Sequence, residues 1–242
     1  GTYAAHAAAL QADWADWLAE HYADDAALAA AWGDGMRATD GLDNPSMGIY
    51  GAWEMAADGP SMNPAEVERM GDWIAFLAAR QRDGYQNRVS LLRADAGYEG
   101  VIVSTAWKAG GGSAVLANLW TDDAADAIDR HGYFGGGTLD SWWQLGPGPI
   151  ANGSMLTEPG QGVFDFADLQ IEDKPFLLSE WTSSPPNQQK LEAVPMVAFY
   201  GMGLYGWDAS LHFAGGHAWF DGGWPGWTQY GGQTPHHLGQ FQ

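Results

Sequence analysis

Four short segments with strand-like runs, separated by segments of helical or loop character, most constrain how this chain can fold. The runs lie in residues 99–107, 123–134, 174–181 and 204–214. Strands that alternate with helices pair in parallel, because each helix returns the chain to the same end of the sheet. The first run contains Val101, Ile102 and Val103, as expected of a strand buried on both faces. The sequence therefore predicts an α/β fold built from β/α units.

Two long helices are predicted ahead of the first strand. Residues 4–32 carry Ala, Leu and Trp at three- and four-residue spacing among acidic residues, which is typical of a helix. A second helix is expected to begin at Asn63, as N-cap, with Pro64 in its first turn, and to end at Gly97. Its buried stripe is expected to contain four residues: Ile74, Leu77, Leu91 and Leu92. A later helix is expected to kink at Pro195.

The charge of the chain excludes several kinds of partner. Ten basic and thirty acidic residues give a net charge of -20, which repels nucleic acid and anionic membranes. There is no cysteine, so disulfides and thiolate metal sites are excluded, and no run approaches the ~18 apolar residues of a membrane span. A surface rich in Asp and poor in Lys stays hydrated in salt and suggests a salt-loving or marine source. The start at Gly1 suggests a processed, trimmed or fragmentary N-terminus.

Tryptophan is abundant, with fourteen residues in 242. Some of these residues are expected in the core, but several lie in Gly-rich segments that read as loops. Exposed aromatic faces pack against sugar rings and also against protein partners. The loop tryptophans are Trp142, Trp143, Trp219, Trp224 and Trp227.

Polar and aromatic residues follow or end each predicted strand. In a barrel, successive strand ends deliver their side chains to one mouth, where a carboxylate among Tyr, His and Trp suits a nucleophile or acid/base group. Taken singly, Glu180 could serve a helix N-terminus, His131 could be structural and Trp207 could belong to the core. The strand-end residues are Ser104, Thr105, Trp107, Asp129, His131, Tyr133, Glu180, Trp181, Trp207, Asp208 and His212.

Four segments resemble clan A glycoside hydrolases, which are retaining β-glycosidases on a (β/α)8 TIM barrel. The segments "KPFLLSEW", "DRHGYFGG" and "AFYGMGLYGWDASLHFA" resemble the region of the sixth to eighth strands. "LRADAGYEGVIVSTAW" resembles the fifth strand and the helix before it. The similarity is greatest to the β-galactosidase-like and agarase-like branches.

This resemblance implies roles for individual residues. Glu180 would be the nucleophile, Tyr133 would hydrogen-bond it and keep it ionised, and Trp207 would be the platform beneath the innermost sugar. Three residues would line the pocket: His131, Trp107 and Trp181. Two polar residues would bond sugar hydroxyls: Asp208 and His212. The resemblance implies no cofactor and no metal.

The acid/base residue of the family is not found in this sequence. The family carries it in an Asn-Glu pair at the end of the fourth strand, and no Asn-Glu pair occurs here. Glu54 and Glu158 are weak substitutes, because both lie in predicted loops. Residues 1–242 therefore resemble the fifth-to-eighth-strand part of the barrel, as a single catalytic-domain fragment. The missing N-terminal half is expected in the same polypeptide.

A half barrel would leave two open strand edges, so the isolated chain is expected to be poorly soluble or to self-associate, with little hydrolysis. The alternative function is a non-catalytic carbohydrate-binding or scaffold protein that uses its Trp-rich loops. A metal-dependent hydrolase is a third, weaker possibility, drawing on His131, His212, His217, His236 and His237. Sugar specificity and exo or endo action stay open, and secretion or a periplasmic location is compatible with a polysaccharide enzyme.

Overall fold

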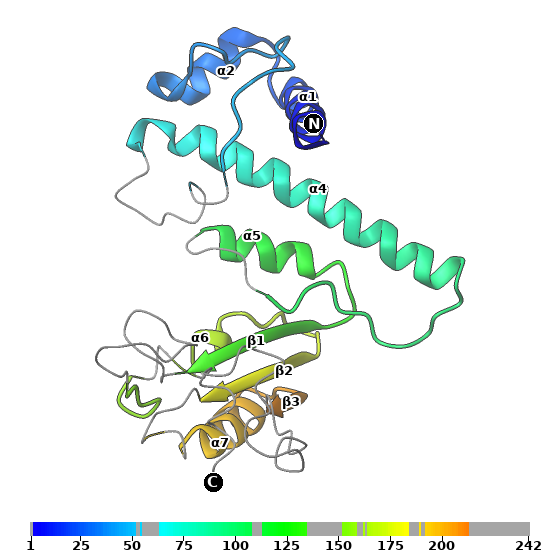
Figure 1. Ribbon diagram of the computed structural model, residues 1–242, viewed down its shortest axis with the longest axis vertical. Helices are drawn as coiled ribbons and strands as arrows, with labels where there is room; N and C mark the ends of the chain where they lie inside the picture. Colours follow the sequence, from blue (N-terminus) through cyan, green and yellow to red (C-terminus); the bar gives the residue numbers. More distant parts are fainter. Residues whose placement is uncertain are drawn as a thin grey trace. The chain divides into compact units, whose positions relative to one another are not determined.

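The computed structural model describes residues 2–51, 54, 63–107, 113–134, 152–158, 162, 164–183, 189 and 192–212 (Figure 1). The chain divides into two compact units, which are treated separately below. The helical unit comprises Gly1–Glu99 and Lys108–Ala124, and the sheet unit comprises Gly100–Trp107 and Ala125–Gln242. That all 242 residues belong to one barrel domain stays a prediction.

The helical unit begins with two helices where the sequence predicted one. Asp24 has an extended backbone, and its side chain accepts a hydrogen bond from the amide of Ala27 at 2.8 Å, which caps a new helix. The prediction of a continuous helix over 4–32 was therefore wrong at residues 22–24. The elements of this unit are α1 (Thr2–His21), α2 (Asp25–Trp32), η1 (Gly33–Gly35), η2 (Pro64–Glu66), α4 (Val67–Ala94) and α5 (Ser113–Asp122).

The ends of the long helix agree with the sequence, but its buried face does not. The Asn63 side chain accepts a hydrogen bond from the Ala65 amide at 3.2 Å, and Gly97 has a positive φ of 64° just beyond the helix. Ile74 and Leu77 are partly buried, whereas Leu91 and Leu92 are 57% and 36% exposed. The buried stripe was therefore placed wrongly, and it contains Arg69, Met70, Trp73 and Phe76.

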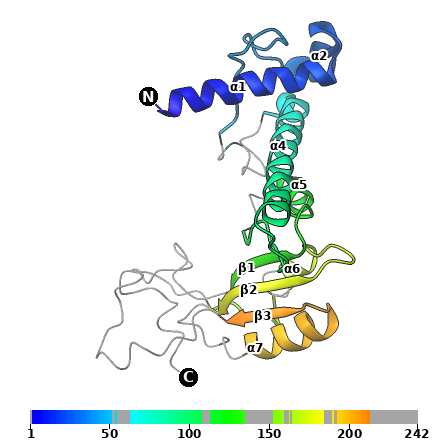
Figure 2. The ribbon, with the colours of Figure 1, turned by 90° about the vertical axis from the view of Figure 1, so that its right-hand side faces the viewer.

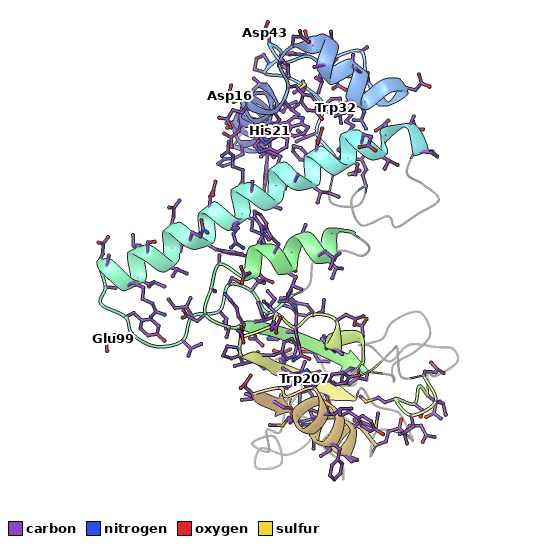
Figure 3. All side chains as sticks on the ribbon, turned by 180° about the vertical axis from the view of Figure 1, so that it is seen from behind. Asp16, His21, Trp32, Asp43, Glu99 and Trp207 are labelled. Carbon is purple, nitrogen blue, oxygen red and sulfur yellow. The ribbon has the colours of Figure 1, made fainter. Side chains whose placement is uncertain are left out.

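Aromatic rings packed against one another form the core of the helical unit. The ring centroid of Trp14 lies 5.6 Å from that of Trp17, 6.1 Å from that of Trp32 and 5.2 Å from that of Trp73. Figure 3 labels Trp32, whose Nε1 donates to Oδ2 of Asp72 on α4 at 2.7 Å. These tryptophans stabilise the fold by burying large aromatic surfaces.

A buried ion pair lies beside this core. The Arg69 side chain donates to both carboxylate oxygens of Asp40, at 2.8 Å and 2.7 Å, and neither side chain is exposed. Loss of one partner would leave the other charge buried, which typically costs about 3–5 kcal/mol. The pair therefore fixes α4 against the loop that carries Asp40.

The sheet unit contains a parallel three-stranded sheet in the order β1-β2-β3 (Figure 2). Its residues lie in β/α order, with helices between strands. The elements are β1 (Ile128–Phe134), α6 (Phe164–Ala167), β2 (Phe176–Ser183), α7 (Ala193–Met196), the π-helix η5 (Val197–Leu204) and β3 (Ala209–His212). Pro195 lies in the first turn of α7, where its missing N–H has no helical partner to lose, and the helix continues past it into η5.

The strand predicted in residues 99–107 is reduced to one parallel bridge, between Val103 and Ala127. Val101 and Val103 are 65% and 40% exposed, so the expectation of burial on both faces was wrong. The bridge places this segment beside β1, and the order of neighbours in the sheet then follows the order in the chain. Barrels have this order, and so does one half of an open doubly wound sheet. Closure into an eight-stranded barrel stays a prediction.

The apolar face of the sheet packs against short helices. Gly132 of β1 allows this at α6, because a Cβ there would lie 2.3 Å from the Phe166 ring. The Phe166 ring meets the Phe134 ring edge-on, with centroids 5.9 Å apart. This packing leaves the opposite face of β1 to the polar side chains described next.

Candidate active site around Glu180

A β-bulge in β2 places consecutive polar side chains beside β1. Arg130 pairs with Leu178 and His131 pairs with Glu180, so Ser179 is the extra residue on β2. A bulge redirects side chains and is frequent beside active sites. Alternation along β1 puts Asp129, His131 and Tyr133 on one face, and both Ser179 and Glu180 contact residues of that face.

The Glu180 carboxylate lies between a tyrosine and a histidine. The Tyr133 hydroxyl donates a hydrogen bond to Glu180 Oε1. The other oxygen, Oε2, lies 3.6 Å from Nδ1 of His131, and the Glu180 side chain is 26% exposed. A carboxylate that is held by a donor and still open to solvent can attack an electrophilic carbon.

Ser179 contacts the other ring nitrogen of His131 and is itself held by Asp129. The Ser179 hydroxyl donates to Asp129 Oδ2 at 2.6 Å, and the Ser179 amide donates to Oδ1 at 3.1 Å. Nε2 of His131 lies 3.2 Å from the same hydroxyl oxygen. Ser179 was not among the residues predicted for the site, because its contacts depend on the bulge and no sequence signal marks a bulge at this position.

Trp107 lies at the edge of this cluster. The His131 amide donates to the carbonyl of Ala106 at 2.8 Å, which fixes the segment before Trp107 next to β1. The Trp107 ring is edge-on to the His131 ring, with centroids 5.3 Å apart, and Trp107 is 56% exposed. Its indole can therefore offer an apolar surface beside Glu180.

Trp207 and Asp208 are not brought to the Glu180 end of the strands. Trp207 is 3% exposed, packs on Phe176 with centroids 5.2 Å apart, and donates from Nε1 to Gln170 at 3.2 Å (Figure 3). The Asp208 carboxylate accepts from the Phe176 amide at 2.9 Å, at the start of β2. The Trp207 ring therefore lies in the core, against its predicted role as a sugar platform. The Asp208 carboxylate links the residue before β3 to the start of β2.

Trp181 and His212 lie at the same end of the sheet as Glu180, but they differ in their exposure to solvent. Trp181 is 3% exposed, and its Nε1 donates to Ser210 at 2.7 Å, so its ring is part of the packed interior. His212 is exposed, and its Nε2 lies 3.1 Å from the Thr182 hydroxyl. Partial desolvation of the ring lowers the pKa of the His212 imidazole, although the residue as a whole is exposed. Of these two, His212 is the residue that a ligand can reach.

The two substitute acids do not join the cluster in the described contacts. Glu54 lies in the helical unit and accepts from the Gly51 amide at 2.6 Å. Glu158 is exposed in the sheet unit, and its amide donates to the Ser154 carbonyl at 2.9 Å. Neither residue has a described contact with Glu180.

The described residues contain neither a candidate membrane span nor a candidate metal site. No helix among them is both long and apolar enough to cross a membrane, and no group of three or more His, Asp or Glu among them is placed to hold a metal ion. The remaining sequence candidates lie outside the described residues: Trp142, Trp143, Trp219, Trp224, Trp227, His217, His236 and His237.

Comparison of the chain with models of known families, with curated proteins and with solved structures gave no match.

Proposed function

We propose that this chain carries the nucleophile half of a retaining glycoside hydrolase, with Glu180 as the nucleophile. The observation that supports this most directly is the partly exposed Glu180 carboxylate with the Tyr133 hydroxyl donating to it. The tyrosine donor holds the carboxylate through Oε1, and Oε2 accepts no hydrogen bond in the described contacts. The same pairing is what the resemblance to clan A glycoside hydrolases implies for these two residues.

The proposed reaction has two displacements. In the first, a Glu180 oxygen forms a bond to the anomeric carbon while the bond to the leaving oxygen breaks, and a carboxylic acid gives its proton to that oxygen. In the second, water gives a proton to the resulting carboxylate and attacks the anomeric carbon, which releases Glu180. We propose that the acid/base carboxyl comes from a part of the polypeptide beyond these 242 residues, about 5 Å from Glu180.

The neighbours of Glu180 take supporting roles in this proposal. The exposed Trp107 indole provides the apolar surface on which a sugar ring packs, and His212 provides a polar group at the same end of the sheet. Trp181 and Trp207 act through packing. The substrate is a poly- or oligosaccharide with β-glycosidic bonds.

A covalent trap tests the proposal without the acid/base residue. A 2-deoxy-2-fluoro β-glycoside with a dinitrophenolate leaving group needs no protonation on departure, and its glycosyl-enzyme accumulates because the fluorine slows hydrolysis. We expect one glycosyl unit on Glu180, found by mass spectrometry of the peptides, with at least one of the galactosyl, glucosyl and xylosyl reagents.

The matched variants are Glu180→Gln, which should form no adduct, and Glu158→Gln, which removes an exposed carboxylate of the same unit and should react like the original chain. An adduct on another residue would overturn the assignment of Glu180. Sugar binding without any adduct would favour the alternative function, a non-catalytic carbohydrate-binding protein, for which the exposed Trp107 is also suited.

A further inference from the structure

The Ser179 hydroxyl decides which nitrogen of His131 carries a hydrogen. A serine hydroxyl has a single hydrogen to donate. Its oxygen lies 2.6 Å from Asp129 Oδ2 and 3.2 Å from His131 Nε2. The shorter contact is with a carboxylate, which accepts but does not donate, so the serine hydrogen lies on that contact. The hydroxyl can then only accept from His131, and Nε2 must be the donor.

This arrangement leaves Nδ1 directed at Glu180. In the neutral imidazole only one nitrogen carries a hydrogen, so Nδ1 presents a lone pair to Oε2 at 3.6 Å. Nδ1 is itself buried and makes no hydrogen bond among the described residues. Two lone-pair atoms face each other there, so neutral His131 does not donate to Glu180.

The groups that face His131 in the described structure are Asp129 on its own strand, reached through Ser179, and Glu180 on β2. The Tyr133 hydroxyl donates to the other oxygen of Glu180, so the described hydrogen bond to this carboxylate comes from the tyrosine and not from the histidine.

We propose that Asp129 and Ser179 are positioning residues that fix the hydrogen of neutral His131 on Nε2, so that Nδ1 faces Glu180 Oε2 without donating to it. The value of this arrangement to catalysis rests on the proposed function, whereas the state of His131 does not depend on it.

Nitrogen NMR of the ¹⁵N-labelled full chain tests the proposal directly. The chemical shifts of the two ring nitrogens distinguish Nε2–H from Nδ1–H and from the doubly protonated ring, and the His131→Asn spectrum identifies the His131 signals among those of the seven histidines. We expect neutral His131 to be the Nε2–H form. Observation of the Nδ1–H form in the original chain would overturn the proposal without any variant.

Two substitutions at Ser179 test its role in placing the hydrogen. Ser179→Ala removes the acceptor for Nε2–H, so the His131 signals should shift toward Nδ1–H, whereas Ser179→Thr keeps a hydroxyl and should preserve Nε2–H. An unchanged tautomer in Ser179→Ala, with the near-ultraviolet spectrum preserved, would overturn the role of the serine. If Ser179→Ala loses that spectrum, the Thr variant and the original chain still decide the outcome.

The covalent trap supplies a second readout. In Ser179→Ala the Nδ1–H form would face Oε2 of Glu180 and donate to it, so adduct formation should be slower than in the original chain and in Ser179→Thr. Equal rates in Ser179→Ala and the original chain would contradict this effect of the tautomer. If no adduct forms while His131 is found as Nε2–H, the proposed function fails and the placement of the hydrogen stands.

Discussion

The hydroxyl of Tyr133 donates to the Glu180 oxygen opposite the one that faces His131. A hydrogen bond to a charged group contributes about 1.5–3 kcal/mol, which corresponds to roughly 10- to 100-fold in rate. We expect Tyr133→Phe to slow adduct formation by that factor, measured as release of dinitrophenolate.

The matched control for this substitution is Tyr3→Phe, because Tyr3 is 91% exposed on α1. It should leave the rate unchanged. Equal rates in Tyr133→Phe and the original chain would show that the tyrosine does not assist Glu180.

Tyr22 provides a pH-dependent test of the helical unit. Desolvation, followed by the hydrogen bond to Asp72 at 2.6 Å and the charge of Asp72, raises the pKa of Tyr22 from 10.0 to about 12. A raised pKa means that the neutral form is favoured in the folded state. This stabilisation is fully present below pH 10 and is lost as the pH rises through about 12.

The measurement is an ultraviolet absorbance titration of the original chain against Tyr22→Phe, in which the difference isolates Tyr22. We expect a difference curve centred near pH 12. In Asp72→Asn the curve should move to lower pH, because the charge is removed while burial stays. A difference curve centred at pH 10 in the original chain would contradict the contact with Asp72.

The residues of the site differ in how far the sequence could predict them. Tyr133 and His131 share a face of β1 because they are alternate residues, which a sequence can indicate, whereas the bulge in β2 brings Glu180 to that face. The burial of Trp207 depends on Gly201, which leaves room for the indole ring, and a close approach between segments is invisible in a hydropathy pattern. The same limit applies to Ser179, whose role arises from pairing between strands.

At the scale of elements, Gly201 in η5 is required for the packing of Trp207. A Cβ at Gly201 would lie 2.4 Å from Cε3 of Trp207, whose ring is held by Phe176 and Gln170. Gly201→Ala should therefore lower the free energy of unfolding by about 1–3 kcal/mol, as expected of overpacking. Urea denaturation followed by tryptophan fluorescence measures the change.

Gly203 offers the control within the same helix. A Cβ there would lie 3.4 Å from the Ala198 carbonyl oxygen, so it needs little adjustment. Gly203→Ala should leave stability unchanged or raise it by up to about 1 kcal/mol, because alanine loses less backbone entropy in a helix. Equal destabilisation by both substitutions would show that contact with Trp207 is not the cause.

Strands β1 and β2 and helix α4 lie where the sequence predicted them, since their apolar runs and caps are local signals. The predictions failed where an element depends on its neighbours. Leu91 and Leu92 are apolar but exposed, and the β-branched run at 101–103 forms one bridge. The break before α2 carried a local signal in Asp24, which is a favourable N-cap residue.

At the scale of the whole molecule, the net charge of -20 makes stability depend on salt. Repulsion between surface carboxylates is screened when the Debye length falls from about 30 Å at 0.01 M salt to about 3 Å at 1 M. We expect Tm to rise over this range. If screening relieves about 2 kcal/mol, the rise is roughly 4–8 °C for a chain of this size.

Differential scanning calorimetry in sodium chloride measures this effect, with sucrose at equal osmolality as the control. Sucrose is excluded from protein surfaces but does not screen charge. An equal rise of Tm in both solutions would show that exclusion, and not screening, stabilises the chain.

The extra residue in β2 also has a consequence for how this sequence should be aligned and engineered. A count of alternate positions from Phe176 would put Glu180 on the same side of the sheet as Phe176. The extra residue, Ser179, reverses this, so the residues beyond it face the side opposite to the one that the count gives. A design or alignment that treats β2 as a regular strand of the same length would preserve every apolar residue and still exchange the places of Glu180 and Trp181. Comparisons based on alternation should therefore allow a single-residue gap at this point.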